Sequence, residues 1–83
     1  MIGKDIIPIG TFGETKEFHY SIVYWMAGTL FLVHLGPEGA VNAEQVPGIT
    51  RYRALDIMRR QKEYPAEDPY DLVLLAQKLT APA

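Results

Sequence analysis

An uncharged stretch from Phe18 to Pro37 constrains the fold more than any other part of the chain. It reads FHYSIVYWMAGTLFLVHLGP, and the small residues Ala27 and Gly28 interrupt it near its middle. β-branched and aromatic side chains, which favour strands, are frequent before and after this interruption. We therefore predict two antiparallel strands joined by a tight turn, so that a β-hairpin forms the base of the fold.

The same stretch has the length of a membrane-spanning helix, which needs about 20 apolar residues. His19 and His34 near its ends lower its hydropathy, and Tyr24 and Trp25 lie in its middle. Spanning helices instead place such rings at their ends. We therefore expect no membrane association. The N-terminus lacks the apolar run of a signal peptide and the chain lacks cysteine, so we expect a cytoplasmic location.

Within the stretch, the hydrophobic pattern has the two-residue period of a strand. The two faces of the first strand are Phe18, Tyr20, Ile22 and Tyr24 against His19, Ser21, Val23 and Trp25. In the second strand, Leu30, Leu32 and His34 alternate with Phe31, Val33 and Leu35. Because both faces of the second strand are apolar, we expect it to be central and covered on both sides. Helices would cover one side, and the N-terminal arm, a second copy or a partner the other.

Shorter segments flank this hairpin. Residues 4–9 form an apolar run that contains Pro8, which cannot donate to a strand ladder, and we predict an edge strand or an extended arm. Residues 10–13, GTFG, are predicted to form a turn. Residues 36–39, GPEG, are predicted to end the second strand. Residues 40–46 fit a short strand or one helical turn equally well.

Two helices are predicted in the second half of the chain. The first spans residues 50–64, with Thr50 as its N-cap and Pro65 forcing its end. Its apolar stripe consists of Ala54, Leu55, Ile57, Met58 and Gln61. The second spans residues 69–80, with Asp68 as its N-cap and Pro69 in its first position. Its main stripe is Leu72, Leu75, Ala76 and Leu79, with Val73 and Leu74 outside it.

These elements predict an α+β fold, with an antiparallel β-hairpin or three-stranded sheet followed by two α-helices packed on one face. The 83 residues form a single domain, with the sheet in residues 4–35. A chain this short buries roughly 60–65% of the surface that its unfolded form exposes. Without cysteine, no disulfide reinforces the core, so self-association or a bound partner is expected to add buried surface.

No residue pattern indicates catalysis or a bound cofactor or metal. Glu14 and Glu17 would point to opposite faces of a strand, and Ser21 lacks the strand-turn-helix context of a nucleophile. His19 and His34 could approach each other across the hairpin, but the chain offers no further ligands with metal-site spacing. The glycines of residues 10–13 lack the lysine of a phosphate-binding loop. We therefore expect neither enzymatic activity nor a cofactor.

Two surfaces remain as candidates for binding a partner. The first is the apolar and aromatic sheet face, with Tyr24, Trp25 and Phe31 as contact residues. It suggests a small protein–protein interaction module, such as an adaptor, an inhibitor or a small subunit, that binds a protein partner or forms a homodimer. The sequence does not identify the partner or the biological process.

The second candidate surface is the basic helix, which suggests a nucleic-acid-binding module as an alternative. Its candidate contacts are Arg53, Arg59 and Arg60. Residues 50–62 carry five basic side chains and one acidic one, and residues 63–71 carry four acidic side chains and no basic one. Since these two segments can compensate each other and the net charge is -2, the protein-interaction hypothesis is preferred.

Overall fold

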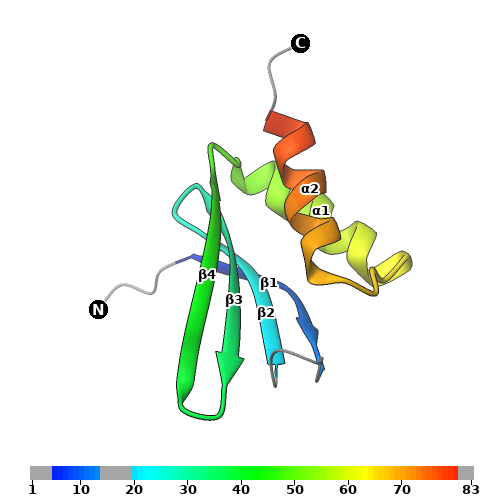
Figure 1. Cartoon of the computed structure of the whole chain (residues 1–83). Coiled ribbons are helices and arrows are strands. Elements are labelled where there is room, and N and C mark those ends of the chain that lie inside the picture. Colours follow the sequence, from blue (N-terminus) through cyan, green and yellow to red (C-terminus); the bar gives the residue numbers. More distant parts are fainter. Residues whose placement is uncertain (1–4, 14–19, 81–83) are drawn as a thin grey trace.

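In the computed structural model of the chain, a four-stranded antiparallel sheet is followed by two helices (Figure 1). The structure describes residues 5–13 and 20–80, and only the backbone of residues 40–42. The elements are β1 (Ile6–Phe12), β2 (Tyr20–Met26), β3 (Thr29–Gly36), β4 (Gly39–Pro47), α1 (Arg51–Glu63) and α2 (Pro69–Thr80). Each strand pairs with its neighbours in sequence, in the order β1-β2-β3-β4. The predicted α+β fold is confirmed, although the sheet has four strands where a hairpin or a three-stranded sheet was expected.

Two short turns connect the central strands as predicted. Ala27 and Gly28 join β2 to β3 with φ angles of 50° and 87°. Two successive positive φ angles are typical of the type I′ turn, whose twist matches that of the flanking strands. At the other end of β3, Gly36 pairs with Gly39 across the turn that leads into β4.

One segment differs from the sequence-based prediction, and a second has a structure that the sequence left open. Residues 10–12, predicted as part of a turn, belong to β1, because a β-bulge at Ile9 lets the strand continue past Gly10. This continuation buries Phe12 in the core. Residues 40–46, whose sequence fits either a short strand or a helical turn, form most of β4 by pairing with β3. Phe18 and His19, predicted to lie in the first strand of the hairpin, are outside the described residues.

Both helices begin at the predicted residues. The Thr50 hydroxyl accepts a hydrogen bond from the Arg53 N–H at 3.1 Å, and the Asp68 carboxylate accepts one from the Tyr70 N–H at 2.9 Å. Val73 was predicted to lie outside the buried stripe of α2, and this is wrong. Because α2 contacts three strands as well as α1, its buried arc is wide enough to include Val73. Leu74 remains 60% exposed, as expected.

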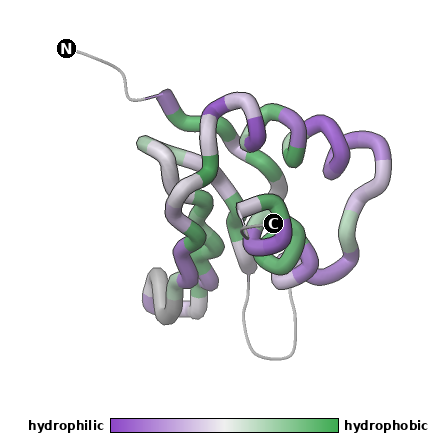
Figure 2. Tube along the Cα trace, turned by 90° about the horizontal axis from the view of Figure 1, so that it is seen from above, coloured by the Kyte–Doolittle hydropathy of each residue, from purple (hydrophilic) through white to green (hydrophobic). Residues whose placement is uncertain are grey.

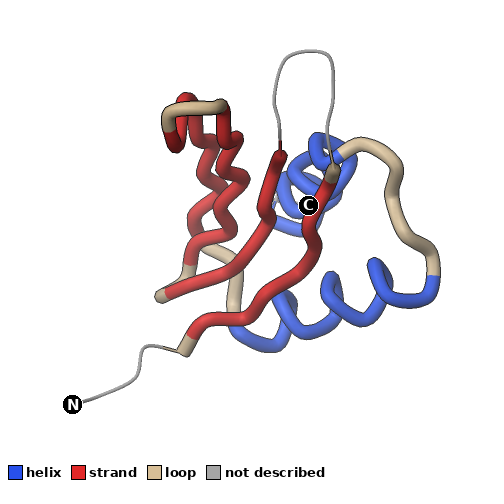
Figure 3. Tube along the Cα trace, turned by 90° about the horizontal axis from the view of Figure 1, so that it is seen from below, coloured by secondary structure: helices blue, strands red, loops and turns tan. Residues whose placement is uncertain are grey.

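Both helices pack on the same face of the sheet, as predicted (Figures 1 and 3). α1 lies over β1, and α2 lies over β2, β3 and β4. The core between sheet and helices includes Ile7, Ile9, Val23, Trp25, Leu30, Leu32, Val46, Ile49, Ala54, Ile57, Leu72, Val73 and Ala76. Figure 2 shows that hydrophobic residues concentrate in the strands and α2, whereas α1 and the connection after it are largely hydrophilic.

The opposite face of the sheet is not covered by any element of the described chain (Figure 3). The N-terminal segment was one of the possible covers, but its described part, β1, lies in the sheet as an edge strand paired with β2. Neither of the two described helices is long and apolar enough to cross a membrane.

Candidate functional site

The face of the sheet opposite the helices, termed the open face, is the most distinctive surface of the protein. Strand alternation and pairing register determine which residues lie on it. They are Ile6, Pro8 and Thr11 of β1; Tyr20, Ile22, Tyr24 and Met26 of β2; Thr29, Phe31, Val33 and Leu35 of β3; and Ala43, Gln45 and Pro47 of β4. None of these residues is charged. The described part of the open face is therefore neutral over all four strands.

The centre of the open face is aromatic and aliphatic. Tyr24 and Phe31 pair directly across β2 and β3, and their rings stack with centroids 5.1 Å apart and planes inclined by 21°. Ile22 and Val33 form the next pair on this face. All four residues are half-buried although no described element lies over them, because neighbouring side chains on a sheet shield each other. Their remaining exposed surface faces outward.

The polar side chains of the open face lie at its margins, beside apolar residues such as Ile6 and Pro47. Thr11 lies on the edge strand β1, Gln45 on the edge strand β4, and Thr29 beside the turn between β2 and β3. Within the centre, the Tyr24 hydroxyl is the one side-chain group able to form a hydrogen bond. An apolar centre with a polar margin is the usual anatomy of a protein–protein interface.

β2 and β3 differ from the strands of a solvated antiparallel sheet, because they are largely apolar on both faces. Such a sheet normally places its polar residues outward and its apolar residues toward the core. Here Phe31 and Val33 lie outward, whereas the polar residues Ser21 and His34 are buried beneath the helices. Ser21 and His34 can be buried because their side chains form a hydrogen bond with each other. The outward residues remain half-exposed and apolar, so the open face has the composition of a surface that is covered.

The structure separates the residues predicted to bind a partner into three places. Tyr24 and Phe31 lie together on the open face. Trp25 lies on the covered face, is only 6% exposed, and donates a hydrogen bond from Nε1 to the Ile49 carbonyl at 2.7 Å. Adjacent residues of a strand point to opposite faces, so Trp25 cannot share a surface with Tyr24. The expected grouping is corrected accordingly, and Trp25 is a core residue.

The three predicted arginines lie exposed on α1, on the other side of the sheet from the open face. Arg60 forms an ion pair with Asp56 at 3.2 Å, whereas Arg53 and Arg59 form none with a described residue. Arg53 and Arg60 are seven residues apart and lie on one side of α1, while Arg59 lies on another. The basic helix and the aromatic sheet face are thus two separate surfaces.

A buried polar network connects α2 to the sheet. Ser21 Oγ lies 2.7 Å from His34 Nδ1, and His34 Nε2 lies 2.9 Å from the Tyr70 hydroxyl. A serine next to a histidine is also the arrangement of an activated nucleophile. Ser21 is only 1% exposed, however, so a substrate cannot reach its hydroxyl. The network therefore positions α2 on the sheet; His19, the other histidine considered, lies outside the described residues.

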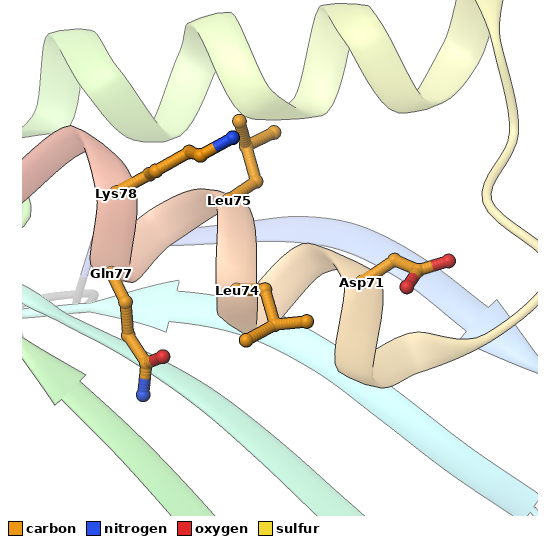
Figure 4. Close-up of a pocket in the computed structure, with 5 residues that line it drawn as sticks. All are labelled: Asp71, Leu74, Leu75, Gln77 and Lys78. Atoms are coloured by element: carbon orange, nitrogen blue, oxygen red, sulfur yellow. The ribbon is translucent and has the colours of Figure 1, made fainter.

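The helical side of the molecule carries several open hollows. One of them, about 550 Å³, follows α2 and is lined by Asp71, Leu74, Leu75, Gln77 and Lys78. In Figure 4, Leu75 points toward α1, and Leu74 and Gln77 point to the other side of α2. The lining combines a carboxylate, an amide and an ammonium group but contains no hydroxyl, thiol or imidazole nucleophile. This hollow offers less support for a functional role than the open face.

The aliphatic residues of the open face were not among the predicted contacts. The two-residue alternation already grouped Ile22 with Tyr24 and Val33 with Phe31. The pairing register, which decides that these two groups lie side by side, was needed to recognise them as one surface.

Comparisons with known proteins do not assign this chain to a family. No protein-family model matches the sequence, and neither curated proteins nor solved structures give a significant match. Functional inference therefore starts from the geometry described above.

Proposed function

We propose that this protein is a small non-enzymatic interaction module that binds another protein surface through the open face. The observation that supports this function best is the neutral, apolar centre of a sheet face that no described element covers. Exposure of apolar surface costs about 25 cal/mol per Å² relative to its burial. Contiguous exposed apolar patches are therefore uncommon on proteins that act alone, and they mark interaction sites.

The residues of the open face suit such a role. Tyr24 and Phe31 supply large, rigid contact surfaces, and aromatic residues contribute strongly to binding energy at interfaces. The Tyr24 hydroxyl and the Gln45 amide can form hydrogen bonds with a partner and so restrict its orientation. An adaptor, an inhibitor and a small subunit of a complex would all use a surface of this kind.

Nucleic-acid binding through α1 has less support. Asp56 neutralises Arg60, and Arg53 and Arg59 do not form a single basic stripe along the helix. The exposed ring of Tyr52 could stack on a base, but no described groove accompanies it.

Site-specific photocrosslinking tests the proposed function in cells that produce the full chain. The photoreactive residue p-benzoylphenylalanine replaces Phe31 on the open face in one variant and Tyr52 on α1 in a matched control. Tyr52 is aromatic and 72% exposed, and it lies on the helical side of the sheet. We expect a discrete protein adduct from position 31, its loss on adding Val33→Lys, and no equivalent adduct from position 52. The proposal is wrong if position 31 yields no protein adduct or the same adducts as position 52.

A further inference from the structure

We infer that the surface bound by the open face is the open face of a second copy of this chain. Two sheets would pack against each other, with the helices of each copy on the outside. This inference rests on the proposed function and names its partner. Two properties of the open face favour a second copy over a different occupant, and two more determine the mode and the strength of the association.

The first property is the absence of charge. In a two-fold symmetric dimer, a patch meets the same patch of its partner, so every charged group near the axis would face its own copy. The described strands place no charged residue on the open face, although the chain carries eighteen Asp, Glu, Lys and Arg residues. A surface that selects a different partner usually carries complementary charges. The open face is instead compatible with itself.

The second property is its width. Four strands at a spacing of about 4.8 Å span about 19 Å, whereas one helix with its side chains is about 10–12 Å wide. The covered face accordingly needs both α1 and α2. A single partner helix would leave much of the open face in water. A second copy supplies a sheet of equal width and identical twist, and twisted sheets pack face to face at a separation of about 10 Å.

The third property is that both edges of the sheet disfavour the other mode of self-association, in which edge strands pair. On β1, Pro8 has no N–H to donate, and the bulge at Ile9 interrupts the regular edge. On β4, Glu44 pairs with Leu32 and therefore lies on the covered face, and inward-pointing charges of this kind discourage edge pairing. The open face has no comparable obstacle.

The fourth property is its area. Strands of seven residues are about 24 Å long. With the width of about 19 Å, the open face has a flat area of about 450 Å² per copy and about 900 Å² for two copies. The uneven surface of the side chains is not included in this area. Specific interfaces bury about 1,200–2,000 Å² in total, and weak or transient ones bury less. The open face falls below this range, among the weak or transient interfaces. We therefore expect a dimer with a dissociation constant on the order of 1–100 µM.

Sedimentation velocity of the purified full chain, from about 1 µM to about 500 µM, tests this inference, since the range brackets the expected constant. The wild-type protein should change from monomer to dimer as its concentration rises through this range. Val33→Lys places a charge at the centre of the open face, where it would be buried against the same charge of the second copy. We expect the dissociation constant to rise by about 100-fold or more.

Two controls separate loss of dimerisation from loss of folding. Leu74→Lys adds the same charge at an exposed apolar position of α2, and it should dimerise like the wild type. Val33→Glu alone should be as monomeric as Val33→Lys, but an equimolar mixture of the two should recover dimers because the opposing charges attract. Far-UV circular dichroism checks that each variant has the wild-type fold.

A wild-type protein that stays monomeric throughout, or a Val33→Lys variant that dimerises like the wild type, would overturn the inference. If substitutions at position 33 unfold the chain, the purified protein with p-benzoylphenylalanine at position 31 decides the question. Adducts that map to the open face of another copy support the dimer, and adducts elsewhere or none contradict it. A monomer that crosslinks from position 31 to a different protein in cells rejects self-association but retains the proposed function.

Discussion

Replacing Trp25 with phenylalanine tests how the sheet holds the start of the helical layer. Trp25 Nε1 donates to the Ile49 carbonyl at 2.7 Å, and the Ile49 N–H donates to the Gly28 carbonyl at 3.0 Å. Ile49 is 1% exposed and immediately precedes Thr50, the N-cap of α1. These two hydrogen bonds therefore fix the segment that leads from β4 into α1.

The expected loss of stability has two parts. Phenylalanine cannot donate a hydrogen bond, so the buried Ile49 carbonyl loses its indole partner, which costs about 1–3 kcal/mol. The smaller ring also leaves unfilled space at a core position, which adds about 1 kcal/mol. The sum is about 2–4 kcal/mol, against a total stability of about 4–12 kcal/mol for a chain of 83 residues. The melting temperature should fall by about 10–25 °C.

Urea unfolding followed by far-UV circular dichroism measures this loss, because the signal does not depend on the tryptophan that is removed. Wild type and variant are compared at equal protein concentration, since association would add to the apparent stability. Tyr52→Phe is the control: it removes one polar group from an aromatic side chain that is 72% exposed, and it should change stability by less than about 0.5 kcal/mol. A Trp25→Phe variant within about 0.5 kcal/mol of the wild type would refute the reasoning.

Two further substitutions test the turn and the buried network. Ala27 has a φ of 50°, which asparagine tolerates better than alanine, so Ala27→Asn should stabilise the hairpin by about 0.5–1 kcal/mol; an unchanged melting temperature would count against the type I′ assignment. Ser21→Ala removes the hydroxyl bonded to the buried ring of His34 and should cost about 1–3 kcal/mol in urea unfolding. Tyr70→Phe should cost less, because Tyr70 is 38% exposed and its hydrogen bond to His34 is only partly buried, so that water can take the place of the lost hydroxyl; equal losses would contradict this explanation.

Most of the secondary structure could be predicted from sequence because its signals are local. Ala27-Gly28 determined the central turn, Thr50 and Asp68 the helix starts, and Pro65 the end of α1. The exceptions depended on distant pairing. Gly10 suggests a turn when read alone, but residues 10–12 gain three partners in β2 and bury Phe12.

The candidate site could be predicted only in part. Alternation placed Tyr24 and Phe31 in suitable positions, and both lie on the open face. The same alternation placed Trp25 on the other face. The predicted contact residues were nevertheless selected because they are aromatic, without regard to their face, and so the three rings were grouped together. The arginines were correctly expected to be exposed, and the structure adds that they lie on the far side of the sheet from the open face.

By itself, the sequence determined that β2 and β3 have two apolar faces, since alternation is a property of the local backbone. It could not determine which face the helices cover, because both faces offer comparable hydrophobic burial. Only the tertiary structure made that choice, by providing Tyr70 of α2 as a partner for His34 and the Ile49 carbonyl as an acceptor for Trp25. Buried polar groups must have hydrogen-bond partners. The side chains at the centre of the other face need almost none; they are Ile22, Tyr24, Phe31 and Val33. The helices therefore lie over the face that contains Ser21, Trp25 and His34, and the apolar face remains open.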